Sequence, residues 1–509
     1  MSKPNIIIFN PDQWRADVLG HTGNPAALTP NLDEMVSKDA VSFSNAYCQS
    51  TICTPSRCSF MTGLYPHTRG HRTMHHMLHL EHGETHLMRL LKENGYYVWW
   101  SGKNDLLPAD SDFSESCDCR FNASEDDYRR WGYSLREGTH GGSMLWRGDP
   151  NGSNYYSFLK GKLDKADKDV YFDNDWAAVF GAIDVIAAYE EDTPFCINLS
   201  LTSPHPPYCV EEPWFSSINR VAIPDIRHEP ENYSGKASML KGLYENQNLQ
   251  SWDDERFREL RAIYYGMCSR LDYQFGMIVN ILKKRGLYDN TAIFFFSDHG
   301  DYTGDYHIVE KCPNSFEDTL CAVPFIFKPP KEVDFSAGVT DEFIELIDFP
   351  ATVFDLTKID PGYDHFGISL LPLIRGDACT HREAVYCEGG RLRGEIQATE
   401  SESLIDHDPG KPGLYYPRLQ LQMNDDRVYH TKATMCRTKR YKYIKRLYEG
   451  DEFYDLINDP DEVHNVITDP EYMERIQEHK ELMLDWYMRT CDVVPRDTDK
   501  RWLQKGYSQ

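Results

Sequence analysis

Several side chains capable of chemistry follow short apolar runs in the sequence. They come after residues 5–10, 96–100, 194–201 and 291–297, and they are Asp12, Gln13, Lys103, Asp105, His205, Asp298 and His299. Because buried parallel strands end at one edge of a sheet, carboxylates, an amide, a lysine and imidazoles at these positions predict a metal-assisted active site in a crevice. One such residue alone would be weak evidence, since a single Asp after a strand is usually a turn or cap residue.

The strongest local signal is the segment Cys53-Thr54-Pro55-Ser56-Arg57, with Gly63 downstream. Thr54 is a good helix N-cap, Pro55 suits the first helical position and Gly63 favours a helix end. This pattern predicts a short helix with Cys53 at its amino end, where backbone N–H groups and the helix dipole favour an anion. Arg57 is expected one turn inside the helix, where it can point back toward Cys53. An isolated cysteine here would more simply be a buried packing residue.

The apolar runs alternate with segments of helical periodicity, at residues 84–94 and 253–285. With a further apolar run at 322–327, this alternation predicts an α/β fold in which a mostly parallel central sheet lies between helix layers. Near residue 376 the pattern changes to short runs at 384–386 and 441–444 and a polar helix at 471–490. We therefore expect a catalytic domain over residues 1–376 and a smaller C-terminal α+β subdomain, with an antiparallel sheet, over residues 377–509.

Charge and composition exclude several classes of protein. The 509 residues carry 54 Lys and Arg against 80 Asp and Glu, a formal net charge of −26, which disfavours nucleic-acid and anionic-membrane partners. No run approaches the ~20 apolar residues that cross a bilayer. The first residues lack a signal-peptide profile, so we expect a cytoplasmic protein whose 14 cysteines are reduced. The sequence does not distinguish a monomer from a homo-oligomer.

The cysteine segment and its surroundings resemble a known family. Cys-x-Pro-Ser-Arg at 53–57, followed by Thr-Gly-x-Tyr-Pro at 62–66, resembles the signature of the type I, formylglycine-dependent sulfatases of the alkaline phosphatase-like superfamily. Further blocks agree in the same order, at residues 95–103, 203–205, 297–300, 304–311, 437–444 and 452–456. The resemblance runs from about residue 5 to residue 465 and implies an alkaline phosphatase-like fold.

The resemblance also implies two cofactors. One is formylglycine, made from Cys53 by a maturation enzyme that oxidises the thiol. The other is a divalent cation, most often Ca²⁺, for which Asp12, Asp298 and the formylglycine match family ligand positions. Gln13 and His299 occupy the remaining ligand positions, where many members carry Asp and Asn. A histidine ligand widens the choice to Mg²⁺ or Mn²⁺.

The family mechanism assigns roles to the remaining residues. The hydrated aldehyde attacks sulfur, the alcohol leaves, and expulsion of sulfate regenerates the aldehyde. Arg57 is implied to hold the hydrate, and Lys103 and Lys311 to neutralise the sulfate oxygens. His205 is implied to contact the departing oxygen and to donate its proton. Asp105 stands where the family often has His, so we expect it to contact hydroxyl groups of the leaving alcohol or to pair with a lysine.

The expected substrate is a sulfate monoester of a sugar or of a glycosaminoglycan-derived oligosaccharide. One alternative is a phosphonate monoester hydrolase or phosphodiesterase, a related branch that residues 12–15 also resemble. Lys103 favours the sulfatase, because that branch generally carries a tyrosine at this position. The other alternative is a non-catalytic glycan-binding relative, which would have no need of a convertible cysteine.

Overall fold

A computed structural model describes residues 3–134, 151–164, 170–190, 192–395, 416–423 and 429–498. Its largest sheet has nine strands, in the order β11-β2-β10-β8-β1-β6-β3-β4, with β9 paired to β2. The strands are β1 (Asn5–Asp12), β2 (Val41–Tyr47), β3 (Tyr97–Gly102), β4 (Cys119–Phe121), β6 (Phe195–Pro204), β8 (Thr291–Phe296), β9 (Ala322–Val323), β10 (Phe325–Lys328) and β11 (Gly338–Glu345).

Most neighbours in this sheet are parallel, as predicted. The strands β8, β1, β6, β3 and β4 are parallel to one another, whereas β10 runs antiparallel to both β8 and β2. The prediction of a single strand at residues 322–327 is wrong in one respect, because the segment is divided into β9 and β10 at Pro324. A proline has no N–H to give to a sheet ladder, so it interrupts the pairing at this position.

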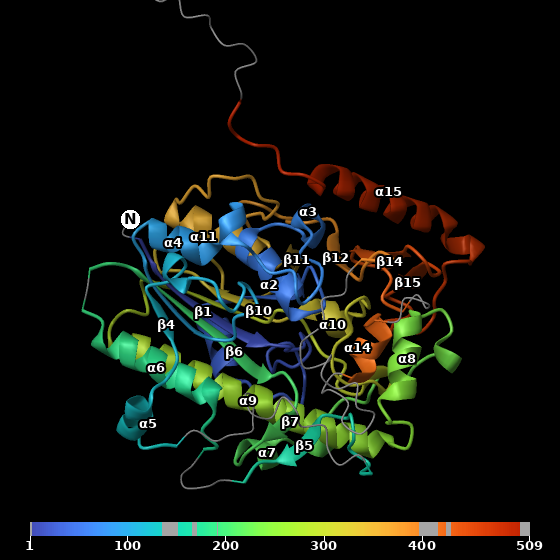
Figure 1. The fold of residues 1–509 in the computed structure, drawn as a ribbon, viewed down its shortest axis with the longest axis horizontal. Coiled ribbons are helices and arrows are strands. Elements are labelled where there is room, and N and C mark those ends of the chain that lie inside the picture. Colours follow the sequence, from blue (N-terminus) through green and yellow to red (C-terminus); the bar gives the residue numbers. More distant parts are fainter. Residues whose placement is uncertain are drawn as a thin grey trace, which may run out of the picture.

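Two apolar cores lie on opposite faces of the sheet. Alternate side chains of β1 enter different cores, Ile7 and Phe9 on one face and Ile6 and Ile8 on the other, as strand geometry requires. One core is covered by α1 (Pro30–Lys38), α6 (Asn174–Ala188) and α9 (Asp254–Lys284), and the other by α2 (Cys53–Thr62), α4 (Leu87–Glu93) and α11 (Asp348–Thr357) (Figure 1). This arrangement confirms the predicted helix layers and the helices predicted at 84–94 and 253–285.

A second, smaller sheet follows, as predicted. It is antiparallel throughout and consists of β12 (Val385–Gly389), β13 (Ala433–Arg437), β14 (Tyr441–Arg446) and β15 (Glu452–Asp455), followed by α15 (Met473–Thr490) (Figure 1). Lys442 Nζ donates to Phe316 O at 2.8 Å, and Arg446 Nη1 donates to Asn314 O at 2.7 Å, so buried cations bind this sheet to the catalytic part. The domain division at residue 376 stays a prediction.

The remaining elements lie between the strands of these two sheets along the chain. They are α3 (Pro66–Arg69), α5 (Glu125–Trp131), β5 (Leu159–Lys162), β7 (Tyr208–Val210), α7 (Trp214–Ser217), α8 (Ser238–Asn246), α10 (Asp318–Cys321), α12 (Leu371–Arg375) and α14 (Tyr416–Met423). Two of them, β5 and β7, pair as a separate two-stranded sheet. Among the described residues, no helix has the length and apolar character that crossing a membrane requires.

Candidate active site

The predicted polar residues meet at one edge of the large sheet. Asp12 is the last residue of β1, while Lys103, His205 and Asp298 follow β3, β6 and β8 within two residues. These four strands are consecutive in the order β8-β1-β6-β3 and parallel, so their carboxyl ends lie side by side. The juxtaposition predicted from the apolar runs is therefore present in the structure.

Helix α2 brings Cys53 to this edge, but it begins earlier than predicted. The N-cap is Ile52 rather than Thr54, Cys53 is the first helical residue, and Pro55 is the third. The prediction failed because Pro55 is tolerated throughout the first turn, where N–H groups have no acceptor within the helix. The end of the helix is as predicted, since Gly63 adopts φ 76° and donates its N–H to Ser59 O at 2.8 Å.

The Cys53 thiol is fully buried among charged and polar groups. Its Sγ lies 3.1 Å from Lys311 Nζ, 3.2 Å from His299 Nε2, 3.3 Å from Lys103 Nζ and 3.6 Å from Asp12 Oδ1. Burial, together with the nearby carboxylate of Asp12, outweighs the two lysines and raises the pKa of the thiol to about 12. At neutral pH Cys53 is therefore a protonated thiol, and it does not act as a thiolate nucleophile.

Potential cation ligands converge beside Cys53. One ligand atom from each of Asp12, Cys53, Asp298 and His299 lies within 4.8 Å of the others, and all four side chains are buried. His299 Nδ1 lies 2.9 Å from Gly300 O. Because a carbonyl oxygen can only accept, this contact places the proton on Nδ1 and leaves a lone pair on Nε2.

The His299 lone pair faces two carboxylates. Nε2 is 3.6 Å from Asp12 Oδ1 and 3.8 Å from Asp298 Oδ1, and burial lowers the pKa of His299. The lone pair of the neutral imidazole therefore faces the lone pairs of two carboxylate oxygens, with the Cys53 thiol beside them and with the backbone N–H groups of Gln13 and His299 donating to Asp298 Oδ1. Such converging lone pairs fit a divalent cation, so the residues of this cluster suit the metal that the family resemblance implies.

Gln13 joins the cluster through a specific orientation of its amide. Lys311 Nζ donates to Gln13 Oε1 at 3.0 Å, while Gln13 Nε2 donates to Asp301 Oδ2. Asp301 therefore determines which amide atom faces the site. Burial raises the pKa of Asp301 to about 7. Sequence analysis missed this residue, although its position three residues after Asp298 could have indicated it.

Arg57 lies between the two ligand carboxylates. Its Nη2 is 2.9 Å from Asp298 Oδ2 and 3.3 Å from Asp12 Oδ2, and its Nη1 donates to Asn10 Oδ1 at 3.0 Å and to Ser200 Oγ. Burial opposes the charge, but the two carboxylates outweigh it and raise the pKa of Arg57. Sequence analysis missed Asn10 and Ser200, which hold the guanidinium from adjacent strands.

Lys103 and Asp105 form an ion pair at the less buried side of the site. Lys103 Nζ lies 2.9 Å from Asp105 Oδ2 and also contacts Asp12 Oδ2. Burial opposes the charge of Lys103, but Asp105 and Asp12 hold its pKa well above the usual value. Their side chains are 19% and 21% exposed, whereas the other predicted site residues are buried. Of the two expectations for Asp105, the structure shows the pair with a lysine.

His205 is present at the site in a neutral form. Its Nδ1 lies 2.8 Å from Pro206 O, so the proton is on Nδ1 and Nε2 carries a lone pair. Burial and the charges of Lys311 and Lys103 hold the pKa of His205 well below its usual value. In this state His205 accepts protons. Its predicted role as proton donor requires the negative charge of a bound sulfate to raise that pKa.

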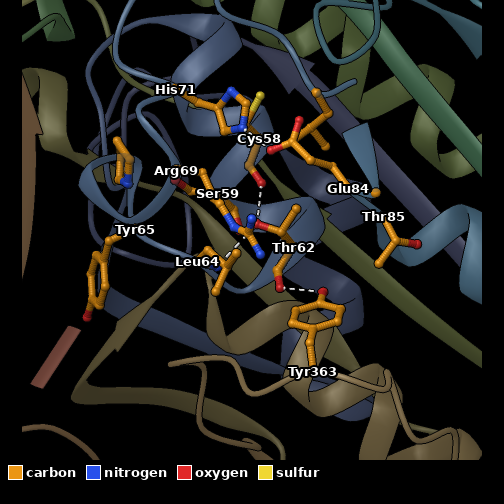
Figure 2. Close-up of a pocket in the computed structure, with 13 residues that line it drawn as sticks. Cys58, Ser59, Thr62, Leu64, Tyr65, Arg69, His71, Glu84, Thr85 and Tyr363 are labelled. Atoms are coloured by element: carbon orange, nitrogen blue, oxygen red, sulfur yellow. Dashed lines mark hydrogen bonds and ion pairs between the residues drawn. The ribbon is translucent and has the colours of Figure 1, made fainter. Parts of the chain in front are cut away.

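A cavity lies beside the C-terminal half of α2 (Figure 2). Its lining includes Cys58, Ser59, Thr62, His71, Glu84 and Tyr363. Tyr363 Oη donates to Thr62 O at 2.7 Å, and His71 Nε2 lies 2.8 Å from Glu84 Oε1. None of the predicted site residues lines this cavity, so it is distinct from the Cys53 cluster.

Comparison with known proteins identifies the family. Residues 4–359 match the family described as Sulfatase. A curated relative, the ulvan-active sulfatase of Formosa agariphila, is 27% identical over 90% of this chain and 76% of its own length.

Solved structures show the same fold. The phosphonate monoester hydrolase of Agrobacterium radiobacter has a TM-score of 0.71 at 21% identity, covering 97% of this chain and 100% of that one. A 2-O GAG sulfatase has a TM-score of 0.67 at 21% identity, covering 96% of this chain and 92% of that one. These matches confirm the expected alkaline phosphatase-like architecture. The chain belongs to the sulfatase family and is a sulfuric ester hydrolase.

Proposed function

We propose that this enzyme hydrolyses the sulfate monoester of a sugar, with formylglycine at position 53 and a divalent cation, most often Ca²⁺ in this family, beside it. The position of Cys53 carries the proposal, because its Sγ lies within 3.3 Å of both lysines and of His299 Nε2. A thiol with a pKa of about 12 is a poor nucleophile there, so the site needs its conversion by a maturation enzyme.

The side chains around position 53 have separate roles in binding the cation and the sulfate group. Asp12, Gln13, Asp298 and His299 would hold the cation, which when bound supplies positive charge next to position 53. Lys311 and Lys103 lie 3.1 and 3.3 Å from the Cys53 sulfur, so they can bind the sulfate oxygens and stabilise the charge that develops on them. Arg57 holds Asp12 and Asp298 in place and compensates their charge.

Lys103 and Asp105 indicate where the alcohol part of the substrate lies. They are the predicted site residues nearest to solvent, with about a fifth of each side chain exposed. We propose that Asp105 contacts sugar hydroxyls from this side while it holds Lys103 toward the sulfate. His205 would face the departing oxygen and return a proton to it once the bound sulfate has raised its pKa.

The names of the relatives support a carbohydrate substrate, since one is an ulvan-active sulfatase and another a 2-O GAG sulfatase. A phosphonate monoester is the second candidate, because a phosphonate monoester hydrolase shares the fold over 97% of the chain. The presence of Lys103 favours the sulfate ester, since it adds a second lysine beside Cys53.

A substrate screen with matured enzyme tests this proposal. We expect hydrolysis of an aryl sulfate reporter and of sulfated mono- or oligosaccharides, and loss of turnover in Cys53→Ala. A kcat/KM for phosphonate monoesters well above that for every sulfate ester would overturn the sulfate assignment. Retained turnover in Cys53→Ala would exclude position 53 as the source of the nucleophile.

A further inference from the structure

A second group of metal-ligating side chains lies away from Cys53. His228 comes from the loop before α8, Asp254 is the first residue of α9, and His307 ends the short 3₁₀ helix η5 (Asp305–His307). One ligand atom from each lies within 4.8 Å of the others. His228 Nε2 is 3.8 Å from Asp254 Oδ2, and His307 Nε2 is 3.9 Å from Asp254 Oδ1. Both distances are too long for hydrogen bonds.

A fourth residue orients one of the imidazoles. Glu229 Oε2 accepts a hydrogen bond from His307 Nδ1, so the opposite nitrogen, Nε2, faces Asp254. A carboxylate that binds the outer nitrogen of a histidine is the usual support of a metal-ligating imidazole, because it fixes the ring and makes the inner nitrogen more basic. The centroids of the two imidazole rings lie 5.4 Å apart, and the ring nitrogen that approaches Asp254 is Nε2 in both.

We propose that His228, Asp254 and His307 bind a divalent transition-metal ion of the zinc class, with Glu229 as the positioning residue for His307. Two imidazoles and one carboxylate suit Zn²⁺, Co²⁺ or Ni²⁺ better than Ca²⁺ or Mg²⁺, which prefer oxygen ligands. Bonds of about 2.0–2.1 Å in a tetrahedral site place neighbouring ligand atoms roughly 3.3–3.5 Å apart. The observed distances of 3.8 and 3.9 Å involve different oxygens of Asp254, and one ligand atom from each residue lies within 4.8 Å of the others, so the side chains must close in on the ion to reach that spacing.

The surroundings leave room for a fourth ligand and give the site a structural role. His228 and Asp254 are more than half exposed, so water can complete the coordination. The site joins the start of α9 to the segment that carries Lys311, four residues after His307. Asp305 of the same segment pairs with Arg15 at 2.8 Å and with Arg261 of α9. A bound ion would add a further connection between α9 and the segment that carries Lys311.

Cobalt binding tests this proposal. The full-length protein is first saturated with Ca²⁺, so that the buried cluster around Asp12 is occupied, and then titrated with Co²⁺ while the visible absorption is recorded. We expect one tetrahedral-type Co²⁺ that is lost in His228→Ala/His307→Ala and whose affinity falls about 10- to 100-fold in Glu229→Gln. Bound Co²⁺ should also raise the thermal midpoint of the wild type but not of the double variant.

Two further variants separate the alternatives. His79→Ala/His82→Ala removes ligands from another exposed His-Glu-His group and should leave this Co²⁺ signal unchanged. Asp254→Asn keeps the shape of the ligand and should weaken binding, which covers the case that the double histidine variant does not fold. If Asp254→Asn and Glu229→Gln bind Co²⁺ as tightly as the wild type, the group is an ion-paired cluster around a protonated His307 and the proposal is wrong.

Discussion

Replacing Arg57 with alanine should destabilise the protein most strongly when no cation is bound. Arg57 is 2% exposed, and its guanidinium lies 2.9 Å from Asp298 and 3.3 Å from Asp12. Its removal leaves two buried carboxylates without their compensating charge, and breaking a buried pair in this way costs about 3–5 kcal/mol. A bound divalent cation compensates the same carboxylates, so the loss should be smaller in saturating Ca²⁺.

The expected change in thermal midpoint follows from the chain length. Unfolding entropies of about 2.1 cal/mol/K per residue give roughly 1 kcal/mol/K for 509 residues that unfold as one unit. Arg57→Ala should therefore lower the midpoint by about 3–5 °C in EDTA, and by less than half of that in saturating Ca²⁺. Differential scanning calorimetry of wild type and variant in both buffers measures the two shifts.

A surface arginine provides the matched control. Arg129 is 74% exposed and pairs with Asp126 at 2.8 Å, and such a pair contributes about 0–1 kcal/mol. Arg129→Ala should shift the midpoint by less than about 1 °C in either buffer. If Arg57→Ala behaves like Arg129→Ala in EDTA, or loses as much stability with Ca²⁺ as without it, Arg57 does not compensate the ligand carboxylates.

Three further changes should have separate effects. Lys311→Met removes a cation 3.1 Å from Cys53 Sγ and should lower kcat/KM for an aryl sulfate about 10²- to 10³-fold. Lys331→Met, at a lysine that is 76% exposed, should leave kcat/KM unchanged. Equal kcat/KM values for the Lys311→Met variant and the Lys331→Met variant would contradict the sulfate-binding role of Lys311. EDTA should abolish turnover and lower the thermal midpoint, and Ca²⁺, Mg²⁺ or Mn²⁺ should restore both; full activity after exhaustive chelation would exclude the metal. Burial lowers the pKa of His86 to about 3, so between pH 6.5 and 3 only the unfolded chain takes up this proton and stability falls as the pH falls. His86→Gln removes this proton uptake. Between pH 7.5 and 5 its free energy of unfolding, measured by chemical denaturation, should therefore rise by about 2 kcal/mol relative to that of the wild type. A difference between variant and wild type that stays the same over this pH range would contradict the low pKa of His86.

The sequence predicts the central strands well because they are buried on both faces and read as continuous apolar runs. The strand β2 was missed, since Ser44 is exposed and Asn45 half-buried in the middle of Val41–Tyr47. The strand β11 was missed for a related reason, because its first half alternates between exposed and half-buried residues. Both are recognised only through their pairing with strands about 300 positions away in the chain, β11 with β2, and β2 with β9, β10 and β11.

The residue types of the site were predictable from the sequence, whereas the hydrogen bonds between its residues were much less so. Strand ends place Asp12 and Asp298 at one edge, and this follows from local pattern alone. The contacts that orient the site were not predictable: Asn10 and Ser200 reach Arg57 from different strands, and Asp301 orients the Gln13 amide. Each depends on which strands are adjacent, and the sheet order is a property of the whole chain.

Mass spectrometry of the tryptic fragment covering residues 39–57, taken from protein produced together with a formylglycine-generating enzyme and active on a sulfate ester, measures the central chemistry directly. We predict a fragment in which the CH₂SH group of position 53 is replaced by CHO, in a proportion that rises with specific activity. A fully active preparation whose fragment carries only the unmodified cysteine would contradict the account.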